Sequence, residues 1–238
     1  MYLQKQSACV EISSITNLLS VLENLELKGR VCYKSEEKIT PDSAEKFIAM
    51  IMKKGHESVL EHESFSARFI CNRATSHQLV RHRLVSYSQE SQRYCNYTKD
   101  GFGNQVSFII PLWARLGEAK LSQQTVDGLY ANEKITRMEY FFLSACCDSE
   151  KSYNILITEG LAPEDARDVL SNACKTEIVV TANLRQWRHM FNIRCDKHAQ
   201  LPIRMLFLEL LDQVNELCPV VFGDIHKRVN SKIPAILA

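Results

Sequence analysis

The feature that most restricts the fold is one segment in which apolar and polar residues alternate. Most of the other apolar segments have helical spacing. Along residues 64–71 every second side chain is apolar, starting at Phe65, which predicts a half-buried β-strand. Residues 176–181 are rich in β-branched side chains and predict a second strand. The expected strands are too few and too irregularly spaced for repeated βαβ units, and the sequence has neither a GxGxxG nor a P-loop motif. The sequence therefore predicts an α+β fold.

Apolar spacing and helix-end signals predict helices over much of the remaining chain. One helix has clear ends, with Thr40 as its N-cap, Pro41 in its first turn and Gly55 at its stop. Pro163, followed by two acidic residues, opens another. The others are expected over residues 12–25, 74–84, 132–147, 184–194 and 202–217. No internal repeat, low-complexity tract or Pro/Gly-rich linker divides the 238 residues, so we predict a single domain spanning residues 1–238.

Composition argues against several classes of protein. The net charge is +1 and the pI about 7.6, so the chain lacks the basic excess typical of a nucleic-acid binder. No apolar run approaches the ~18 residues of a membrane span, and charges interrupt the window where a signal peptide would be apolar. The nine cysteines include no CxxC pair, which argues against a disulfide framework and a zinc site. We therefore expect a cytoplasmic protein with no membrane or nucleic-acid partner.

Arginine is concentrated in two short stretches of this neutral chain. Residues 73–94 contain Arg73, Arg81, Arg83 and Arg93 with a single acid, Glu90. Residues 183–204 contain Arg185, Arg188, Arg194, Lys197 and Arg204 with a single acid, Asp196. Guanidinium groups suit two-pronged contacts to phosphate or to a carbonyl-rich ring, so both stretches indicate a compact anionic ligand. Surface ion pairs or an oligomer interface would account for the same composition.

Helical spacing would place members of each stretch on common faces. Gln78 and Arg81 are three residues apart and would share one face of a helix. The predicted helix 184–194 would present one polar stripe, formed by Arg185, Arg188, His189 and Asn192. Both faces are too polar for an ordinary core, so we expect a ligand or a partner chain to cover them.

Metal-site and nucleophile signals are weak. The one cluster of His and carboxylate residues, His56-Glu57 with Glu61-His62-Glu63, does not have HExxH spacing, so no metal site is predicted. No GxSxG motif is present, and no general base stands beside Ser91 in the sequence. Ser91 is therefore interpreted as a ligand for an anion rather than as a nucleophile.

Residues 81–94, RHRLVSYSQESQRY, resemble the RHRxxSxxxxSxRY signature of flavin-dependent thymidylate synthases. Seven fixed positions within this stretch make the match specific. The resemblance continues in order through Gly55-His56-Glu57-Ser58, Arg167, Thr181-Ala182-Asn183-Leu184-Arg185, Ile193-Arg194 and His198-Ala199-Gln200.

The resemblance implies an α+β single domain with a central, mostly antiparallel sheet and long helices. It also implies a homotetramer whose active sites form between chains. The implied reaction is the reductive methylation of dUMP to dTMP, in which 5,10-methylenetetrahydrofolate supplies the carbon, NADPH reduces FAD, and reduced flavin supplies the hydride. The other class of thymidylate synthase uses a cysteine nucleophile, and this sequence has no evident one.

Roles for individual residues follow from the same resemblance. Arg194 is the implied catalytic residue at the uracil ring, where a guanidinium can stabilise negative charge on N3 and the adjacent carbonyl oxygens. The implied dUMP ligands are Gln78, Arg81, Gln89, Ser91, Gln92, Arg93, Arg167 and Arg194. The implied FAD ligands are Ser58, Arg81, His82, Arg83, Gln89, Asn183, Arg185, His189 and His198. His56 would lie near the flavin ring in an unspecified role.

Three positions depart from versions of the family pattern, and three other functions stay open. Gln89 stands where many members have Glu, His189 where others have Asn, and Cys32 where some have Ser; Cys32 is not assigned to the site. A nucleic-acid-binding module is one alternative, because Arg and Tyr interleave in residues 81–97. The others are a structural oligomer with arginine-lined interfaces and a different flavoenzyme that uses the same pocket.

Overall fold

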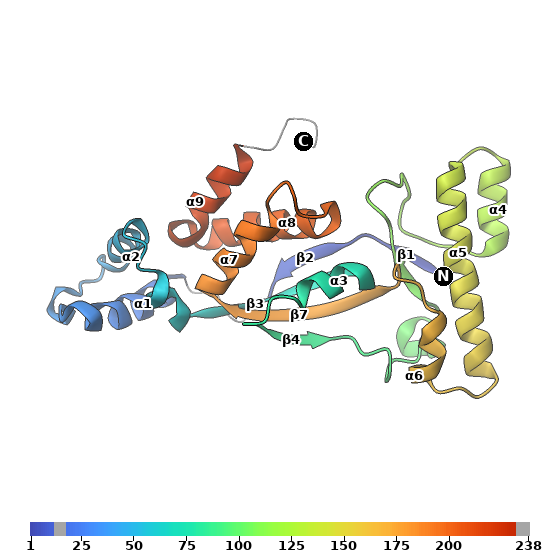
Figure 1. Ribbon diagram of the computed structural model, residues 1–238, viewed down its shortest axis with the longest axis horizontal. Coiled ribbons are helices and arrows are strands. Elements are labelled where there is room, and N and C mark those ends of the chain that lie inside the picture. The colour runs from blue at the N-terminus through green and yellow to red at the C-terminus, as the bar shows by residue number, and fades with distance from the viewer. Residues whose placement is uncertain (12–17, 232–238) are drawn as a thin grey trace. The chain divides into compact units, whose positions relative to one another are not determined.

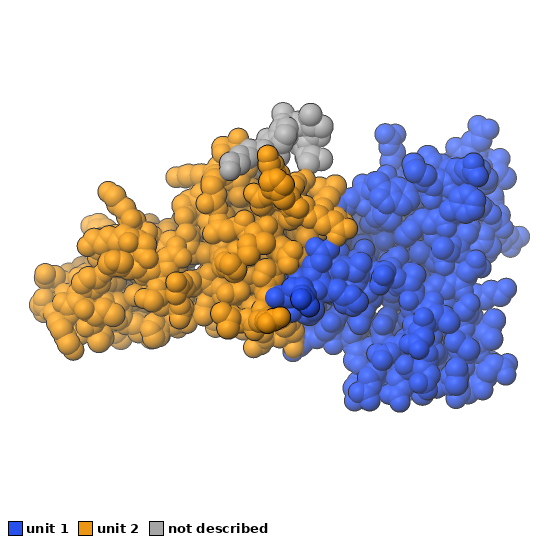
Figure 2. Space-filling model, viewed as in Figure 1, with its two compact units in different colours: residues 1–7, 70–81, 88–178 blue, residues 8–69, 82–87, 179–238 orange. Residues whose placement is uncertain are grey.

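The computed structural model describes residues 1–11 and 18–231 (Figure 1). The chain divides into two compact units, coloured separately in Figure 2. Unit 1 consists of Met1–Ser7, Ile70–Arg81 and Ser88–Ile178, and unit 2 of Ala8–Phe69, His82–Tyr87 and Val179–Ala238. Neither unit is one continuous segment, so neither could be cut from the chain as a piece. That the whole chain is a single domain stays a prediction.

The strands form two sheets. A three-stranded sheet in unit 1 has the order β5-β1-β6, in which β1 (Tyr2–Gln4) pairs in parallel with β5 (Ser107–Ile109) and antiparallel with β6 (Ala119–Lys120). A four-stranded sheet has the order β2-β3-β7-β4. Its strands are β2 (Ser7–Val10), β3 (Ser64–Asn72), β7 (Lys175–Asn183) and β4 (Ser86–Gln89).

The two predicted strands are confirmed as β3 and β7. Phe65, at the start of β3, begins an alternation in which every second side chain is buried, because one face packs on the core. The two strands run antiparallel. The amide of Leu184, just after β7, donates to the carbonyl of Glu63, just before β3, over 2.9 Å. Where β3 ends, the Arg73 amide donates to the Cys174 carbonyl over 3.0 Å.

The helices of unit 1 pack around a core of aliphatic, aromatic and cysteine side chains. Its helices are α3 (Arg73–Leu79), α4 (Gln123–Ala131), α5 (Arg137–Thr158) and α6 (Pro163–Ala166), with 3₁₀ turns at Asp100–Phe102 and Arg167–Val169. Helices α4 and α5 pack against each other (Figure 1). The core residues are Met1, Leu3, Tyr97, Val106, Phe108, Ile110, Val126, Leu143, Cys146, Cys147, Tyr153, Ala166 and Cys174.

Unit 2 is built on stacked aromatic side chains. Its helices are α1 (Leu18–Tyr33), α2 (Ala44–Lys53), α7 (Leu184–Arg194), α8 (Leu201–Leu217) and α9 (Pro219–Asn230), with 3₁₀ turns at Glu36–Lys38 and Glu57–His62. Trp187 of α7 stacks on Phe65 of β3 with ring centroids 4.5 Å apart, and its Nε1 donates to the Phe65 carbonyl. Because the indole is buried with its polar atom bonded, it fixes α7 on the sheet.

The helix predictions were right about type and less accurate about ends. Residues 184–194 form α7 as predicted, and α8 begins one residue before the predicted 202–217. Pro163 opens α6, and the helix preceding Gly55 ends as expected because Gly55 adopts a positive φ of 72°. Of the predicted helix 12–25, residues 12–17 lie outside the described residues, and the rest belongs to α1, which continues to Tyr33.

Three predicted helix ends were wrong. Thr40 does not cap α2, because Ser43 Oγ accepts the Thr40 amide in a separate turn and α2 begins at Ala44. The helix predicted over 74–84 ends at Leu79, since the chain must turn to enter β4, and Leu84 is 80% exposed. The helix predicted over 132–147 begins at Arg137, where Thr136 and Glu139 form a capping box.

None of the helices within residues 18–231 combines the length and apolar character needed to cross a membrane.

Candidate active site

A cavity of about 910 Å³ in unit 2 contains four of the implied flavin ligands. It is lined by Glu61, Ser64, Arg83, Leu84, Val85, Ser86, Thr181, Ala182, Asn183, Arg185, Gln186 and His189. Asn183 ends β7, and its side chain caps α7 by accepting the Gln186 amide over 2.8 Å. Arg185 and His189 follow one helical turn apart, so both project from the exposed side of α7. Arg83 comes from the segment that leads into β4.

The lining of this cavity is polar and cationic. Arg185 pairs with Glu61 through its Nη1 atom, and the two side chains are 52% and 47% exposed. Because both partners are this exposed, the ion pair contributes little stability and can be exchanged for another anion. Arg83 is also exposed. The cavity can therefore offer two guanidinium groups to a phosphate-bearing ligand.

A hydrogen-bonded trio lies beside this cavity in unit 2. Arg194 Nε donates to His82 Nε2 over 2.9 Å, and the Tyr87 hydroxyl donates to the His82 carbonyl over 2.8 Å. Burial, together with the charges of Arg194 and His189, lowers the pKa of the His82 imidazole to about 4. Burial lowers the pKa of Arg194 and raises that of Tyr87 to about 12. At neutral pH His82 is therefore an uncharged acceptor, which orients the Arg194 guanidinium.

Most of the implied nucleotide ligands belong to unit 1, where Gln89 is fixed by two hydroxyl groups. Gln89 Nε2 donates to Ser76 Oγ over 3.0 Å and to Thr176 Oγ1 over 3.1 Å. Arg73 Nη1 also donates to Thr176 Oγ1, over 3.3 Å. Both amide protons of Gln89 are thus used within unit 1, so Oε1 is the atom of this amide that can accept from a ligand.

Two implied phosphate ligands converge on Glu164, the second residue of α6. Arg93 Nε donates to Glu164 Oε2 over 3.1 Å, while Arg167 Nε donates to the Glu164 main-chain carbonyl over 3.0 Å. Ser91 Oγ accepts the Arg93 amide over 3.3 Å. Arg93, Arg167 and Ser91 therefore lie in one neighbourhood, with donors suited to an anion. Gln92 is buried, and its Nε2 donates to Cys174 Sγ over 3.5 Å.

The remaining implied ligands lie outside these groups. Ser58 and His56 are exposed in or beside the 3₁₀ turn Glu57–His62, with the Tyr33 hydroxyl 2.5 Å from His56 Nδ1. The exposed His198 pairs with Asp196 through Nδ1, over 2.7 Å.

Two predictions about residues that share a helix face were wrong. Because α3 ends at Leu79, Arg81 lies beyond the helix that carries Gln78. Arg188 does not belong to a ligand-facing stripe: it is only 6% exposed, and its guanidinium pairs with Asp224 and Glu57. These carboxylates outweigh the effect of burial and raise the pKa of Arg188, so its charge is satisfied within unit 2.

Sequence reasoning missed the partners of the implied ligands. Glu164 and Glu61 had no spacing signal, because they lie 71 and 124 positions from Arg93 and Arg185, and Tyr87 had none because its hydroxyl bonds a main-chain carbonyl. Within residues 1–11 and 18–231, no three His, Cys, Asp or Glu side chains are grouped as a metal ion would require.

Comparison with known proteins identifies the family. The family model described as "Thymidylate synthase complementing protein" matches residues 18–220. The flavin-dependent thymidylate synthase of Geobacter sulfurreducens is 38% identical over 205 residues, covering 83% of this chain and 79% of that protein. The corresponding enzyme of Corynebacterium diphtheriae is 33% identical over 216 residues, covering 87% and 80%.

A solved structure shows the same fold. It is a UMP/dUMP methylase, PolB, from Streptomyces cacaoi, bound with 5-Br dUMP; the TM-score is 0.70 at 22% identity, covering 94% of this chain and 96% of that one. The match to the family model and the identity to curated relatives extend over most of the chain. The chain therefore belongs to the flavin-dependent thymidylate synthase family and is a methyltransferase of that family.

Proposed function

We propose that this protein converts dUMP to dTMP by reductive methylation, with FAD as its cofactor. The observation that carries the proposal is the cavity of unit 2, which Arg83, Asn183, Arg185 and His189 line together. These four residues, implied as flavin ligands by sequence resemblance, come from two separate parts of the chain.

The cavity fits a flavin cofactor. Its volume of about 910 Å³ lies within the ordinary range for cofactor sites. The guanidinium groups of Arg83 and Arg185 would hold the diphosphate, and Asn183 and His189 supply polar atoms for ring edges. When bound, FAD reduced by NADPH would supply the hydride, and 5,10-methylenetetrahydrofolate would supply the carbon. The side chains named here would bind and orient the cofactor.

Most of the proposed nucleotide ligands belong to unit 1, and Arg194 belongs to unit 2. Arg93, Arg167 and Ser91 can donate to the phosphate, and a phosphate dianion would displace the Glu164 carboxylate from Arg93 because that ion pair is exposed. The remaining proposed nucleotide ligands are Gln78, Arg81, Gln89, Gln92 and Arg194.

Arg194 is proposed as the group that activates the uracil ring. Attack at C6 of uracil forms an enolate whose negative charge lies on C5 and the C4 carbonyl oxygen, and a guanidinium at the ring carbonyls stabilises that charge. The hydrogen bond to neutral His82 orients Arg194 without neutralising it, since an uncharged imidazole contributes no negative charge.

The proposal extends to assembly and location. We propose a homotetramer in which active sites form between chains, acting in the cytoplasm. The implied flavin ligands Ser58, His82 and His198, and His56 near the ring, stay part of this proposal.

The first test is the absorption spectrum of purified protein. We expect a yellow protein whose flavin absorbance is bleached by NADPH and which forms dTMP from dUMP only when methylenetetrahydrofolate is added. A colourless protein that cannot be loaded with FAD would refute the proposal. Oligonucleotide binding that is tight and falls steeply with salt would instead favour the nucleic-acid-binding alternative.

A further inference from the structure

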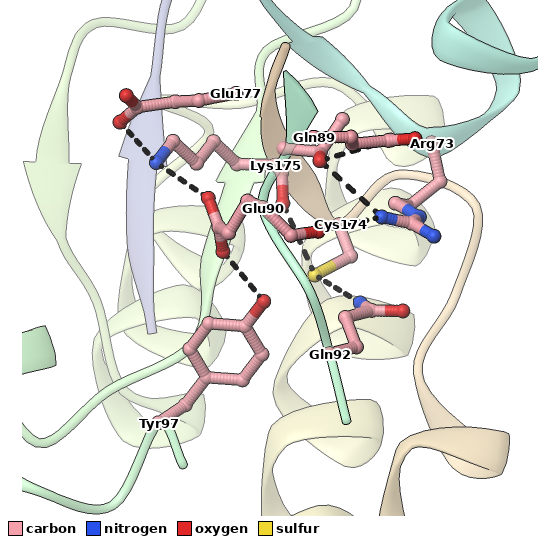
Figure 3. Close-up of polar contacts among 9 residues, drawn as sticks. Arg73, Gln89, Glu90, Gln92, Tyr97, Cys174, Lys175 and Glu177 are labelled. Atoms are coloured by element: carbon pink, nitrogen blue, oxygen red, sulfur yellow. Dashed lines mark hydrogen bonds and ion pairs between the residues drawn. The ribbon is translucent and has the colours of Figure 1, made fainter. Parts of the chain in front are cut away.

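Glu90 holds together the two ends of a loop in unit 1. Tyr97 donates its hydroxyl to Glu90 Oε1 over 2.7 Å, and Lys175 Nζ donates to Glu90 Oε2 over 3.0 Å. Figure 3 shows Lys175 between the carboxylates of Glu90 and Glu177, with Tyr97 reaching Glu90 from another side. The Glu90 amide donates to the Glu177 carbonyl over 2.9 Å, so backbone and side chain are both tied to β7.

The loop between these anchors carries three proposed nucleotide ligands. Residues 91–96 contain Ser91, Gln92 and Arg93. The Ser91 carbonyl accepts the amides of Tyr94 and Cys95, over 3.2 and 2.9 Å, which makes a tight turn. The bond between Glu90 and Tyr97 therefore closes a short loop whose turn presents the proposed phosphate ligands.

The closing contacts are partly buried, and both donors keep their protons at neutral pH. The Glu90 and Lys175 side chains are 14% and 16% exposed, so the carboxylate needs its partners to offset the cost of losing water. Burial lowers the pKa of Lys175, but its bonds to Glu177 and Glu90 outweigh burial and raise it, so the ammonium stays charged. Burial and the Glu90 charge raise the pKa of Tyr97, which keeps its hydroxyl a donor.

We propose that Glu90 is a positioning residue for the nucleotide: clamped by Tyr97 and Lys175, it holds residues 91–96 in the conformation that binds the phosphate. This inference rests on the proposed function. Glu90 acts through Ser91 and Arg93. Without the clamp, the loop would sample other conformations, and binding would have to select the competent one from among them.

Tyr97→Phe tests the clamp because it removes one hydroxyl and keeps the ring. The ring lies in the core of unit 1, with centroids 5.8 Å from Tyr153 and 5.7 Å from Phe102, so its packing is retained. Tyr130→Phe, on the surface of α4, is the matched control. The measurements are dUMP affinity by calorimetry, KM and kcat for dUMP, FAD affinity and the melting temperature.

We expect Tyr97→Phe to weaken dUMP binding about tenfold, since a hydrogen bond to a charged group is worth roughly that factor or more. The expected rise is in KM, with kcat and FAD affinity within about threefold of wild type. Glu90→Gln keeps an acceptor for Tyr97 but loses the charge facing Lys175, so its dUMP affinity should lie between those of wild type and Glu90→Ala. Tyr130→Phe should match wild type throughout.

Two results would overturn the inference. One is unchanged dUMP affinity in Tyr97→Phe. The other is a loss of FAD affinity as large as the loss of dUMP affinity, together with a lower melting temperature, which a general structural role would produce. Failure of the wild-type protein itself to bind dUMP would count against the proposed function instead, so the two failures are distinguishable.

Discussion

Arg194 Nε donates a hydrogen bond to His82 Nε2 over 2.9 Å, joining the residue proposed for ring activation to the second residue of the RHR motif. A ring nitrogen that accepts must be unprotonated, which agrees with the lowering of the His82 pKa to about 4. Within the motif, Arg83 therefore lines the cavity, while His82 accepts the hydrogen bond from Arg194.

The depressed His82 pKa predicts a loss of stability on acidification. Unfolded His82 has its ordinary pKa of 6.5 and folded His82 one of about 4, so between these values the unfolded chain binds the extra proton. The free energy of unfolding should therefore fall as pH is lowered through this window, by about 2 kcal/mol between pH 7 and 5. Urea unfolding of wild type and His82→Gln at pH 7 and pH 5 measures this change in the free energy of unfolding.

His82→Gln is the informative variant because the amide oxygen can still accept from Arg194 but does not titrate. Its stability should fall less than that of wild type over the same pH range. Identical pH dependence in both proteins would show that His82 is not the group responsible.

Arg194→Ala should lower turnover strongly and spare cofactor binding. Removal of the guanidinium leaves developing charge on uracil unstabilised, and the loss of one such donor typically costs a factor of about 10²–10³ in kcat. FAD affinity, which depends on the cavity lining, should stay near wild type. Arg204→Ala, an arginine of the same stretch that donates to the Lys197 carbonyl, is the control. Near wild-type dTMP formation by Arg194→Ala would exclude it as the activating group.

The elements that sequence predicted well have long periodic signals. The strand β3 alternates along its whole length, and α7 and α8 carry apolar stripes with clear starts. The strands β1 and β5 were missed because each has three residues, too few to show a period, and their pairing joins positions about a hundred residues apart.

Family resemblance predicted residues that line the cavity. The sequence did not predict which arginines are held in ion pairs within the protein. Resemblance named Arg83 and Arg185, which line the cavity. Helical spacing placed Arg188 on one stripe with Arg185, but its partner Asp224 lies 36 positions away and Glu57 lies 131 positions away. No local pattern could have shown that those carboxylates satisfy Arg188 inside unit 2.

Substitutions around Glu164 should shift dUMP binding in opposite directions. Arg167→Ala removes a proposed phosphate ligand and should raise the KM for dUMP about tenfold with little change in kcat. Glu164→Gln removes the carboxylate that competes for Arg93 and keeps the backbone carbonyl that Arg167 contacts, so KM should fall. The fall should be no more than about threefold, because the Arg93–Glu164 pair is exposed. Steady-state kinetics at two salt concentrations measures the KM of both variants. Unchanged dUMP affinity in Arg167→Ala would refute the assignment of Arg167 as a phosphate ligand.

Gln89 stands where many relatives have Glu, and its surroundings predict that the exchange is tolerated. Gln89 Nε2 donates to Ser76 Oγ and Thr176 Oγ1. The Thr176 hydroxyl can rotate to donate to a carboxylate instead, and the Ser76 hydroxyl can do so by giving up its bond to the Arg73 carbonyl. Arg73, which contacts Thr176, supplies positive charge nearby. Gln89→Glu should therefore keep kcat/KM for dUMP within about fivefold of wild type. Gln89→Leu leaves both hydroxyls without this partner and the nucleotide without its acceptor, and should lose at least about tenfold. Equal losses in the two variants would show that the amide group itself, rather than an acceptor at this position, is required.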